Sequence, residues 1–295
     1  MKNFTHHILP SLIKYDIIKT LKTTKQNKTT NNIADNIKDT KDISDKNLTN
    51  ISNSSQYEEP FEMTFFKVNW KDYTSPLSKI AATEKWLSPT YPNNGILTNY
   101  ILNTYKKLKS EKNVIITDNY ALFNTGLFTR YHEAIYAYQT INSDVSFLTD
   151  YELGTKGIHE RPERANYFSQ PDLLLFDWHY PINVHYPHIL DDSENKKRIP
   201  KQILQSKNLI NLFDGAINTM KKRVSENYKL AIPQYFDGKI QLLLPLCLQS
   251  DSKPDLALVV TKVGNYYQGH TCLTLDMAYN NARLIAKPES NWLVL

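Results

Sequence analysis

The sequence predicts an α+β protein: a helical N-terminal lobe with a hairpin, then an antiparallel four-strand meander followed by a C-terminal helix. Apolar residues recur every three or four positions over 94–109 and 208–227, the spacing of an amphipathic helix. Four short apolar runs follow between 228 and 275, separated by residues that favour tight turns. A last stretch with helical spacing, 277–286, completes the pattern.

Composition excludes several classes of protein. The chain has 295 residues, with 35 Lys and Arg against 30 Asp and Glu. This basic excess is smaller than that of proteins that coat DNA. Any anion binding must therefore come from a local cluster. No apolar run approaches the ~20 residues of a membrane span, so we expect no membrane partner. Two cysteines are too few for a disulfide scaffold, and we expect a cytoplasmic protein with free thiols.

The chain divides by composition at Phe61. Residues 1–18 have apolar positions at helical spacing and predict a short docking helix for a protein partner, with a targeting signal as the alternative. Residues 19–56 are rich in Thr, Asn, Lys, Asp and Ser and predict a disordered polar linker. Residues 61–295 contain no second linker, which indicates one α+β domain or two closely packed lobes.

The turns of the sheet regions are explicit in the sequence. Asp118-Asn119 lies between two apolar runs and predicts a hairpin after the helix at 94–109. This order fits a winged helix or a plain helix packed on a sheet. Asp237-Gly238 and Gly264-Asn265 join the strands of the meander in pairs. Asp276 stands where the N-cap of the last helix is expected.

Histidines and cysteines offer only weak patterns. His179, His185 and His188 could hold a metal with nearby carboxylates, but their spacing matches no standard ligand set, so we predict no metal site. His270 and Cys272 are two apart and would share a strand face, which makes a Cys–His dyad conceivable beside the simpler reading of buried free cysteines. No phosphate-binding or nucleophile motif occurs, and the cofactor stays open.

Polar residues gather near the meander. Asp276, Asn280 and Arg283 stand at i, i+4 and i+7 and share one helical face. That face could bind a phosphate and a base, or form a structural network in which Arg283 pairs within the helix. Lys222 and Arg223, near the end of the preceding helix, add positive charge that could bind a ligand.

Several strings of the sequence resemble the domain-of-unknown-function family numbered 3825. The similarity runs from about Trp70 to Trp292 and is carried by residues 123–127, 163–168, 227–235, 238–246 and 274–284. Relatives of this domain can be accompanied by small RNA-binding modules, which implies RNA-linked work, although residues 1–60 are too short and polar to form such a module. The polar residues in the matching strings add these ligand-binding candidates: Asn124, Arg164, Asn166, Lys229, Gln234, Lys239, Gln241, Asn280 and Arg283.

The sequence therefore predicts binding of RNA or a nucleotide through a polar, basic cleft beside the meander. Lys and Arg would neutralise phosphate, while Asn and Gln would contact base edges or ribose hydroxyls. One alternative is an enzyme acting on phosphoesters or nucleotides, with Asp255 and Asp276 as catalytic candidates. Another is a scaffold without catalysis, tethered to a partner through the N-terminal helix.

Overall fold

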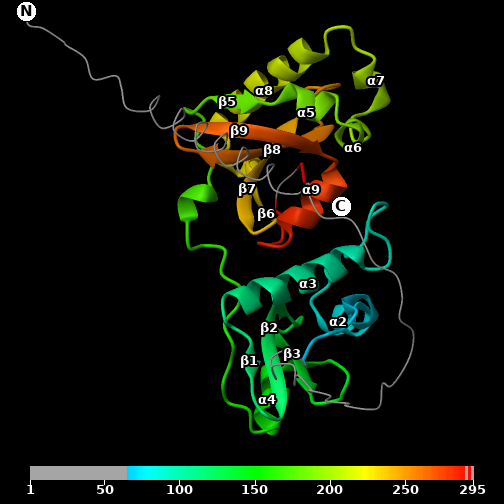
Figure 1. Ribbon diagram of the computed structural model, residues 1–295, viewed down its shortest axis with the longest axis vertical. Coiled ribbons are helices and arrows are strands. Elements are labelled where there is room, and N and C mark those ends of the chain that lie inside the picture. Colours follow the sequence, from blue (N-terminus) through cyan, green and yellow to red (C-terminus); the bar gives the residue numbers. More distant parts are fainter. Residues whose placement is uncertain (1–64, 290–291, 294–295) are drawn as a thin grey trace, which may run out of the picture. The chain divides into compact units, whose positions relative to one another are not determined.

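The computed structural model describes residues 65–289 and 292–293, which Figure 1 draws as a coloured ribbon. Two sheets with helices packed on them form this part of the chain, which confirms the α+β class. The predicted docking helix at 1–18 and linker at 19–56 lie outside the described residues. Within those residues, the structure has no helix of the length and apolar character that a membrane crossing needs.

The first sheet follows the long helix α3, as the sequence predicts. It has four antiparallel strands in the order β1-β2-β3-β4, and its first hairpin turns at Asp118-Asn119. The third and fourth strands extend this hairpin beyond the sequence-based prediction. The elements are η2 (Trp70–Tyr73), α2 (Thr74–Ile80), α3 (Gly95–Ser110), β1 (Ile115–Ile116), β2 (Tyr120–Phe128), β3 (Ala134–Thr140), β4 (Ser146–Thr149) and α4 (Asp150–Thr155).

The second sheet contains the predicted meander. Its four antiparallel strands are joined by a short parallel strand, β5, beside β9, and the order is β5-β9-β8-β7-β6. The strands are β5 (Ile182–Val184), β6 (Ile232–Phe236), β7 (Lys239–Leu246), β8 (Leu256–Val263) and β9 (Tyr266–Leu273). The helices around them are η3 (Pro171–Leu173), α5 (Tyr186–Leu190), α6 (Ser193–Lys196), α7 (Lys201–Leu204), α8 (Leu209–Glu226), η4 (Tyr228–Leu230) and α9 (Leu275–Ala282).

The C-terminal helix begins earlier than predicted. Thr274 is the N-cap of α9, and its hydroxyl accepts a hydrogen bond from the backbone N–H of Met277. Asp276 lies within the first turn, where a carboxylate still interacts favourably with the helix dipole. The prediction that Asp276 caps the helix is therefore wrong, because the hydroxyl two residues earlier fills that position.

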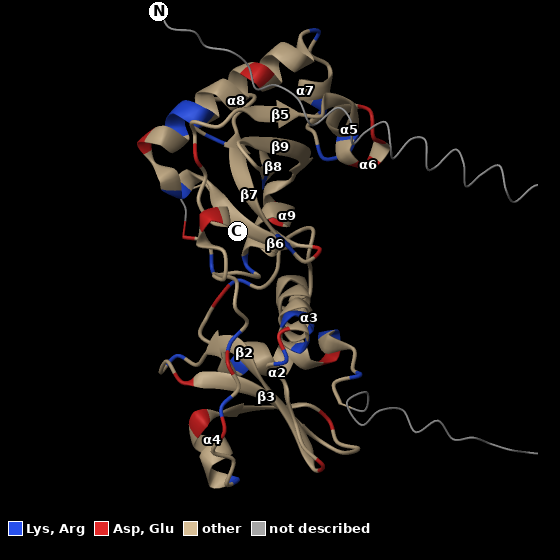
Figure 2. Cartoon of the chain, turned by 60° about the vertical axis from the view of Figure 1, so that its left-hand side comes forward, with Lys and Arg blue, Asp and Glu red and all other residues tan. Residues whose placement is uncertain are grey.

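The second sheet is buried differently on its two faces. One face packs against α8, where Phe213 and Met220 meet Leu244 and Leu258 in an apolar core. Part of the other face belongs to a core shared with α9, α3 and the first sheet. The remainder of that second face carries polar side chains, described below. Figure 2 shows Lys and Arg interspersed with Asp and Glu around both sheets rather than gathered on one face.

Candidate functional site

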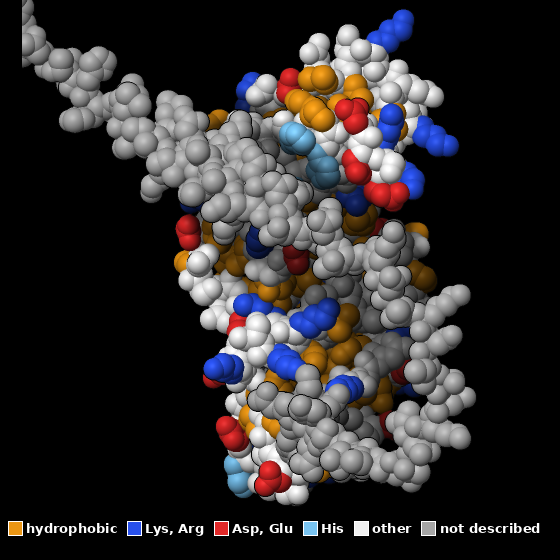
Figure 3. Space-filling view, viewed as in Figure 1, with side chains coloured by type: hydrophobic (Ala, Val, Ile, Leu, Met, Phe, Trp, Pro, Cys, Tyr) orange, Lys and Arg blue, Asp and Glu red, His pale blue; other side chains and the backbone are white. Residues whose placement is uncertain are grey.

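A cavity of about 590 Å³ lies over the polar part of the second sheet, bordered by α9, α3 and the segment containing α5 and α6. We call it the polar cleft. Six amide side chains line it: Asn99, Asn195, Gln234, Gln241, Asn280 and Asn281. The lining also includes His188, His270, Arg198, Asp192 and Glu194. Figure 3 shows histidine and acidic side chains at the surface over α5 and α6.

The β6–β7 hairpin supplies one wall of the cleft by simple register. Its turn has two residues, both with positive φ, so the strands pair directly from Phe236 and Lys239 inward. Side chains two residues apart share a face, so Gln234 and Gln241 form the next pair on that face. The pair after them continues into the apolar core. The hairpin therefore changes from exposed tip to amide pair to core along one face.

A β-bulge in β9 brings two further side chains into the cleft. Val259 pairs with Thr271 and Val260 pairs with Gly269, so His270 is the extra residue. An extra residue breaks the alternation of faces, and both His270 and Thr271 line the cleft. Cys272 instead packs in the core beneath α8, where burial raises its pKa to about 12. The conceivable Cys–His dyad is therefore absent, because the two side chains lie on opposite sides of the sheet.

The amides form a directed chain of hydrogen bonds. Asn281 Nδ2 donates to Gln234 Oε1 (3.1 Å), and Gln234 Nε2 donates to Gln241 Oε1 (3.0 Å). Gln241 Nε2 then donates to the Thr261 hydroxyl (3.1 Å), which lies 3.0 Å from His270 Nε2. Because the hydroxyl oxygen already accepts, its proton can point at His270, making Nε2 the acceptor in a neutral imidazole. Burial and the nearby charges lower the pKa of His270, which also favours the neutral ring.

A second network fixes α6 against the sheet. The Thr271 hydroxyl donates to buried Asn195 (2.7 Å), and Asn195 donates to the backbone carbonyl of His188 (2.9 Å). One terminal nitrogen of Arg198 donates to the Thr271 hydroxyl (3.2 Å). Among the described residues Arg198 has no ion-pair partner, so no carboxylate neutralises it, and it has further N–H donors at the cleft.

Asp192, an acidic residue that lines the cleft, has a structural role. Asp192 caps α6 and accepts from the backbone N–H groups of Glu194 and Asn195. These hydrogen bonds, Asn195 first, lower the pKa of Asp192. Its carboxylate therefore accepts hydrogen bonds from the N-terminus of α6 and forms no ion pair with Arg198.

Asn280 is the least satisfied group of the cleft. Its side chain is 4% exposed, and among the described residues nothing donates a hydrogen bond to its Oδ1. The other end of the amide hydrogen-bonds Tyr91, whose pKa is nevertheless raised, first of all by burial. A buried acceptor without a donor costs about 1–3 kcal/mol. Such groups are rare in folded proteins, and they are explained by strain, by a functional role, or by a bound water or ion.

The three predicted residues on α9 face three different surroundings. Asn280 lines the cleft, whereas Asp276 accepts hydrogen bonds from the hydroxyl and backbone N–H of Thr90. Arg283 is buried, and two of its nitrogens bond the two carboxylate oxygens of Glu84 at 2.6 and 3.0 Å. The Arg283 side chain is thus occupied by a structural ion pair and is not available to a ligand in the cleft.

Asn124, Arg164 and Asn166 hydrogen-bond the backbone and do not line the cleft. Asn124 is buried, donates to the Pro162 carbonyl and accepts from the Gly126 N–H. Gly126 has φ of 75° and lies so close to Tyr100 that a Cβ would stand 2.6 Å from its hydroxyl. Arg164 donates to the Gly126 carbonyl. Asn166 turns the following backbone by accepting from the Phe168 N–H.

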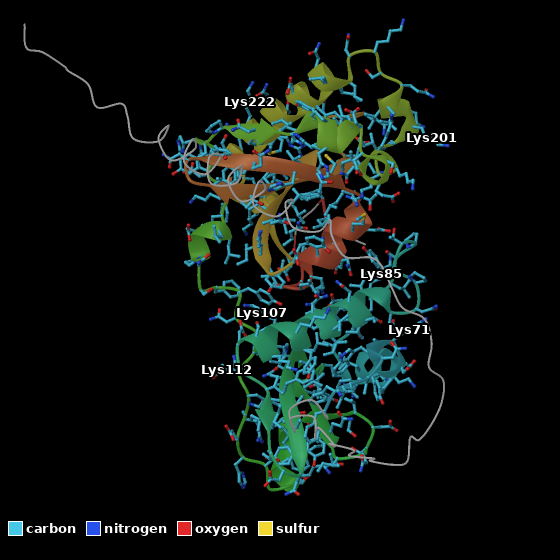
Figure 4. The ribbon with its side chains drawn as sticks, in the orientation of Figure 1. Lys71, Lys85, Lys107, Lys112, Lys201 and Lys222 are labelled. Atoms are coloured by element: carbon cyan, nitrogen blue, oxygen red, sulfur yellow. The ribbon has the colours of Figure 1, made fainter. Side chains whose placement is uncertain are left out.

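The basic candidates are dispersed. Lys222 is exposed on α8, which covers the opposite face of the sheet from α9, as Figure 4 shows. Arg223, also on α8, donates to Cys247 and to the Asp251 carbonyl. Lys229 lines a separate cavity of about 350 Å³. Lys239 lies near enough to His270 to contribute to its lowered pKa. Of the basic candidates, Lys239 is therefore the one beside the cleft.

The catalytic candidates do not form a shared centre with other acids. Asp255 accepts from the backbone N–H groups of Leu248 and Gln249 and from the Gln249 side chain, which closes the loop between β7 and β8. Among the described residues there is no group of three or more His, Cys, Asp or Glu arranged to hold a metal ion. His179 instead contacts Asp177 (2.7 Å) at the surface.

Sequence reasoning missed part of the cleft. Asn195 and Arg198 come from a segment with no regular pattern, and no local signal places them near the sheet. Thr271 depends on the bulge. Asn281 had a usable signal, since it follows Asn280 on a helix predicted to lie beside the meander.

Comparison with protein families identifies the family of this chain. A family model described as Domain of unknown function (DUF3825) matches residues 77–292, and the chain belongs to this family. No curated protein matches the chain. No solved structure matches it either.

Proposed function

We propose that the polar cleft binds a nucleotide, free or as a unit of RNA. The observation that carries the proposal is the buried, unsatisfied Oδ1 of Asn280 in a cleft lined by amides. Nucleobase edges carry N–H donors and ring or carbonyl acceptors in fixed patterns, and amide side chains supply both complements. A base amino group brought to Asn280 would donate to an acceptor that no described residue supplies with a hydrogen bond.

The charge in the cleft suits the rest of a nucleotide. Arg198 is anchored through one terminal nitrogen, and its remaining donors match the geometry of a phosphate. His270, kept neutral by its surroundings, can donate through Nδ1 to a ribose hydroxyl or phosphate oxygen. A volume of about 590 Å³ lies within the range of small-molecule sites.

The test measures nucleotide binding and stability together. Isothermal titration calorimetry with the four ribonucleoside monophosphates should detect binding to the wild-type protein. Asn280→Leu should weaken that binding at least tenfold, while the free energy of unfolding changes by less than about 1 kcal/mol, because removal of the unsatisfied acceptor offsets loss of the hydrogen bond to Tyr91. Loss of a ligand contact without loss of stability is the signature expected of a binding residue.

Asn124→Leu is the matched control. Asn124 is equally buried, but both ends of its amide are hydrogen-bonded and it lies outside the cleft. Its replacement should destabilise the fold by about 1–3 kcal/mol and leave the affinity of the folded protein unchanged. The proposal fails if none of the nucleotides binds, or if Asn280→Leu binds them as the wild type does.

A further inference from the structure

A second cavity, of about 550 Å³, adjoins the polar cleft along α3. We call it the α3 groove; α3 and the tip of the β6–β7 hairpin form its sides. The two cavities share Asn99, Phe236 and Asn281 as lining residues, so they are neighbours. A ligand in the polar cleft that is longer than one nucleotide would extend past Phe236 into the α3 groove.

Phe236 stands at the junction of the two cavities. Its side chain is 59% exposed, and it is absent from the apolar cores of the described residues. The register places it directly opposite Lys239, on the same face as the amide pair Gln234 and Gln241. An exposed aromatic ring beside a lysine is the arrangement on which single-stranded nucleic acids stack.

The two lysines that line the α3 groove differ in whether they have an ion-pair partner. Lys107 pairs with Glu111 (2.7 Å) and lies over the rings of Tyr167 and Tyr235. Lys106 also lines the groove, is exposed and, among the described residues, has no ion-pair partner. The acidic residue of the groove is Asp237, in the hairpin turn.

Lys239 is likewise exposed and unpaired within the described part of the chain. Lys106 and Lys239 therefore provide positive charge on α3 and on the hairpin, beside the ring of Phe236. Figure 4 labels Lys107, the neighbour of Lys106, on α3.

We infer that the ligand is a single-stranded oligonucleotide, with one base in the polar cleft, the next stacked on Phe236, and its phosphates at Lys106 and Lys239. The inference rests on the proposed function, since it extends the same site from one nucleotide to several. It assigns base contacts to the neutral amides and phosphate contacts to the lysines. Affinity should therefore increase with strand length and depend on salt.

Fluorescence anisotropy with labelled oligonucleotides of one to eight residues provides the test, using ribose and deoxyribose series in parallel. Wild-type affinity should rise at least tenfold between the monomer and the tetramer. Phe236→Ser should weaken tetramer binding by about 5- to 100-fold. Lys106→Gln should weaken the tetramer, leave the monomer unchanged and make the salt slope shallower by about 0.7. Lys222→Gln, which removes an exposed lysine on α8, is the charge-matched control.

The outcomes separate the two proposals. If monomer and octamer bind equally tightly, or if Lys106→Gln behaves as Lys222→Gln does, the strand inference is overturned while nucleotide binding stands. If no member of either series binds, both proposals fall. A length-dependent gain in the ribose or the deoxyribose series supports the inference, and the series with the larger gain identifies the strand.

Discussion

The buried ion pair of Glu84 and Arg283 gives a direct test of the structural role of Arg283. Both side chains are less than 10% exposed, and the carboxylate receives two hydrogen bonds from the guanidinium. The guanidinium carbon also lies 4.8 Å from the ring centre of Trp86 and 4.6 Å from that of Tyr100. Desolvation lowers the pKa of Arg283, but the bonds and charge of Glu84 and Tyr100 outweigh it and raise the pKa.

Glu84→Gln removes the negative charge while keeping nearly the same volume. Removing one partner of a buried pair typically costs 3–5 kcal/mol, because the other charge is left uncompensated. Here the two aromatic rings still stabilise the cation, and Gln retains one acceptor, so we expect the lower end, about 3 kcal/mol. For a domain of this size that loss lowers the Tm by about 6–12 °C.

Urea denaturation of the full chain, followed by tryptophan fluorescence, measures the effect directly. Glu194→Gln is the control, because Glu194 pairs with Lys197 with both side chains about 70% exposed. Such a surface pair contributes less than about 0.5 kcal/mol. If Glu84→Gln lowers the free energy of unfolding by less than about 1 kcal/mol, the structural role given to Arg283 is refuted. Arg283 would then again be a candidate for ligand binding.

Three further predictions concern single groups. Burial keeps the pKa of His270 below its ordinary 6.5, so the unfolded chain takes up a proton at a higher pH than the folded chain does. The free energy of unfolding should therefore decline below pH 6.5, and it should decline less in His270→Gln. Urea denaturation midpoints measured at pH 7.5 and 5.5 would show this difference. Native protein should react with a thiol reagent at partly exposed Cys247 only, and Cys272 should react after unfolding, since burial raises its pKa to about 12. Asp276→Asn should cost about 0.3–1 kcal/mol of stability in thermal melts, through the helix dipole, and nucleotide affinity should not change.

Most of the second sheet could be predicted because its signals are local. The pair Asp237-Gly238 determines both the turn and the register, and the strands flanking it appear where the apolar runs indicate. The long helices α3 and α8 also match their apolar spacing within one residue at each end. The prolines of residues 166–188 predict short strands at most, and the pairing of β5 could not be predicted because its parallel contact with β9 is long-range.

The cleft was only partly predictable for the same reason. The register of the β6–β7 hairpin places Gln234 opposite Gln241, and this follows from the turn alone. The β-bulge that places His270 in the cleft results from pairing between β8 and β9. No local feature of the sequence predicts this bulge. Arg198 arrives from a segment without periodicity, more than seventy residues before its partner Thr271.

Arg283 shows what helical spacing can and cannot determine. The spacing predicts one helical face for three polar residues, but in the structure their side chains have three different surroundings. Its partner Glu84 lies 199 residues earlier, so the fold, not the helix, decides that the guanidinium is neutralised. With Arg283 occupied, the polar cleft is lined by neutral amides and one arginine, Arg198, while Lys106 lines the α3 groove. Salt should therefore weaken a bound strand strongly and a single bound nucleotide much less.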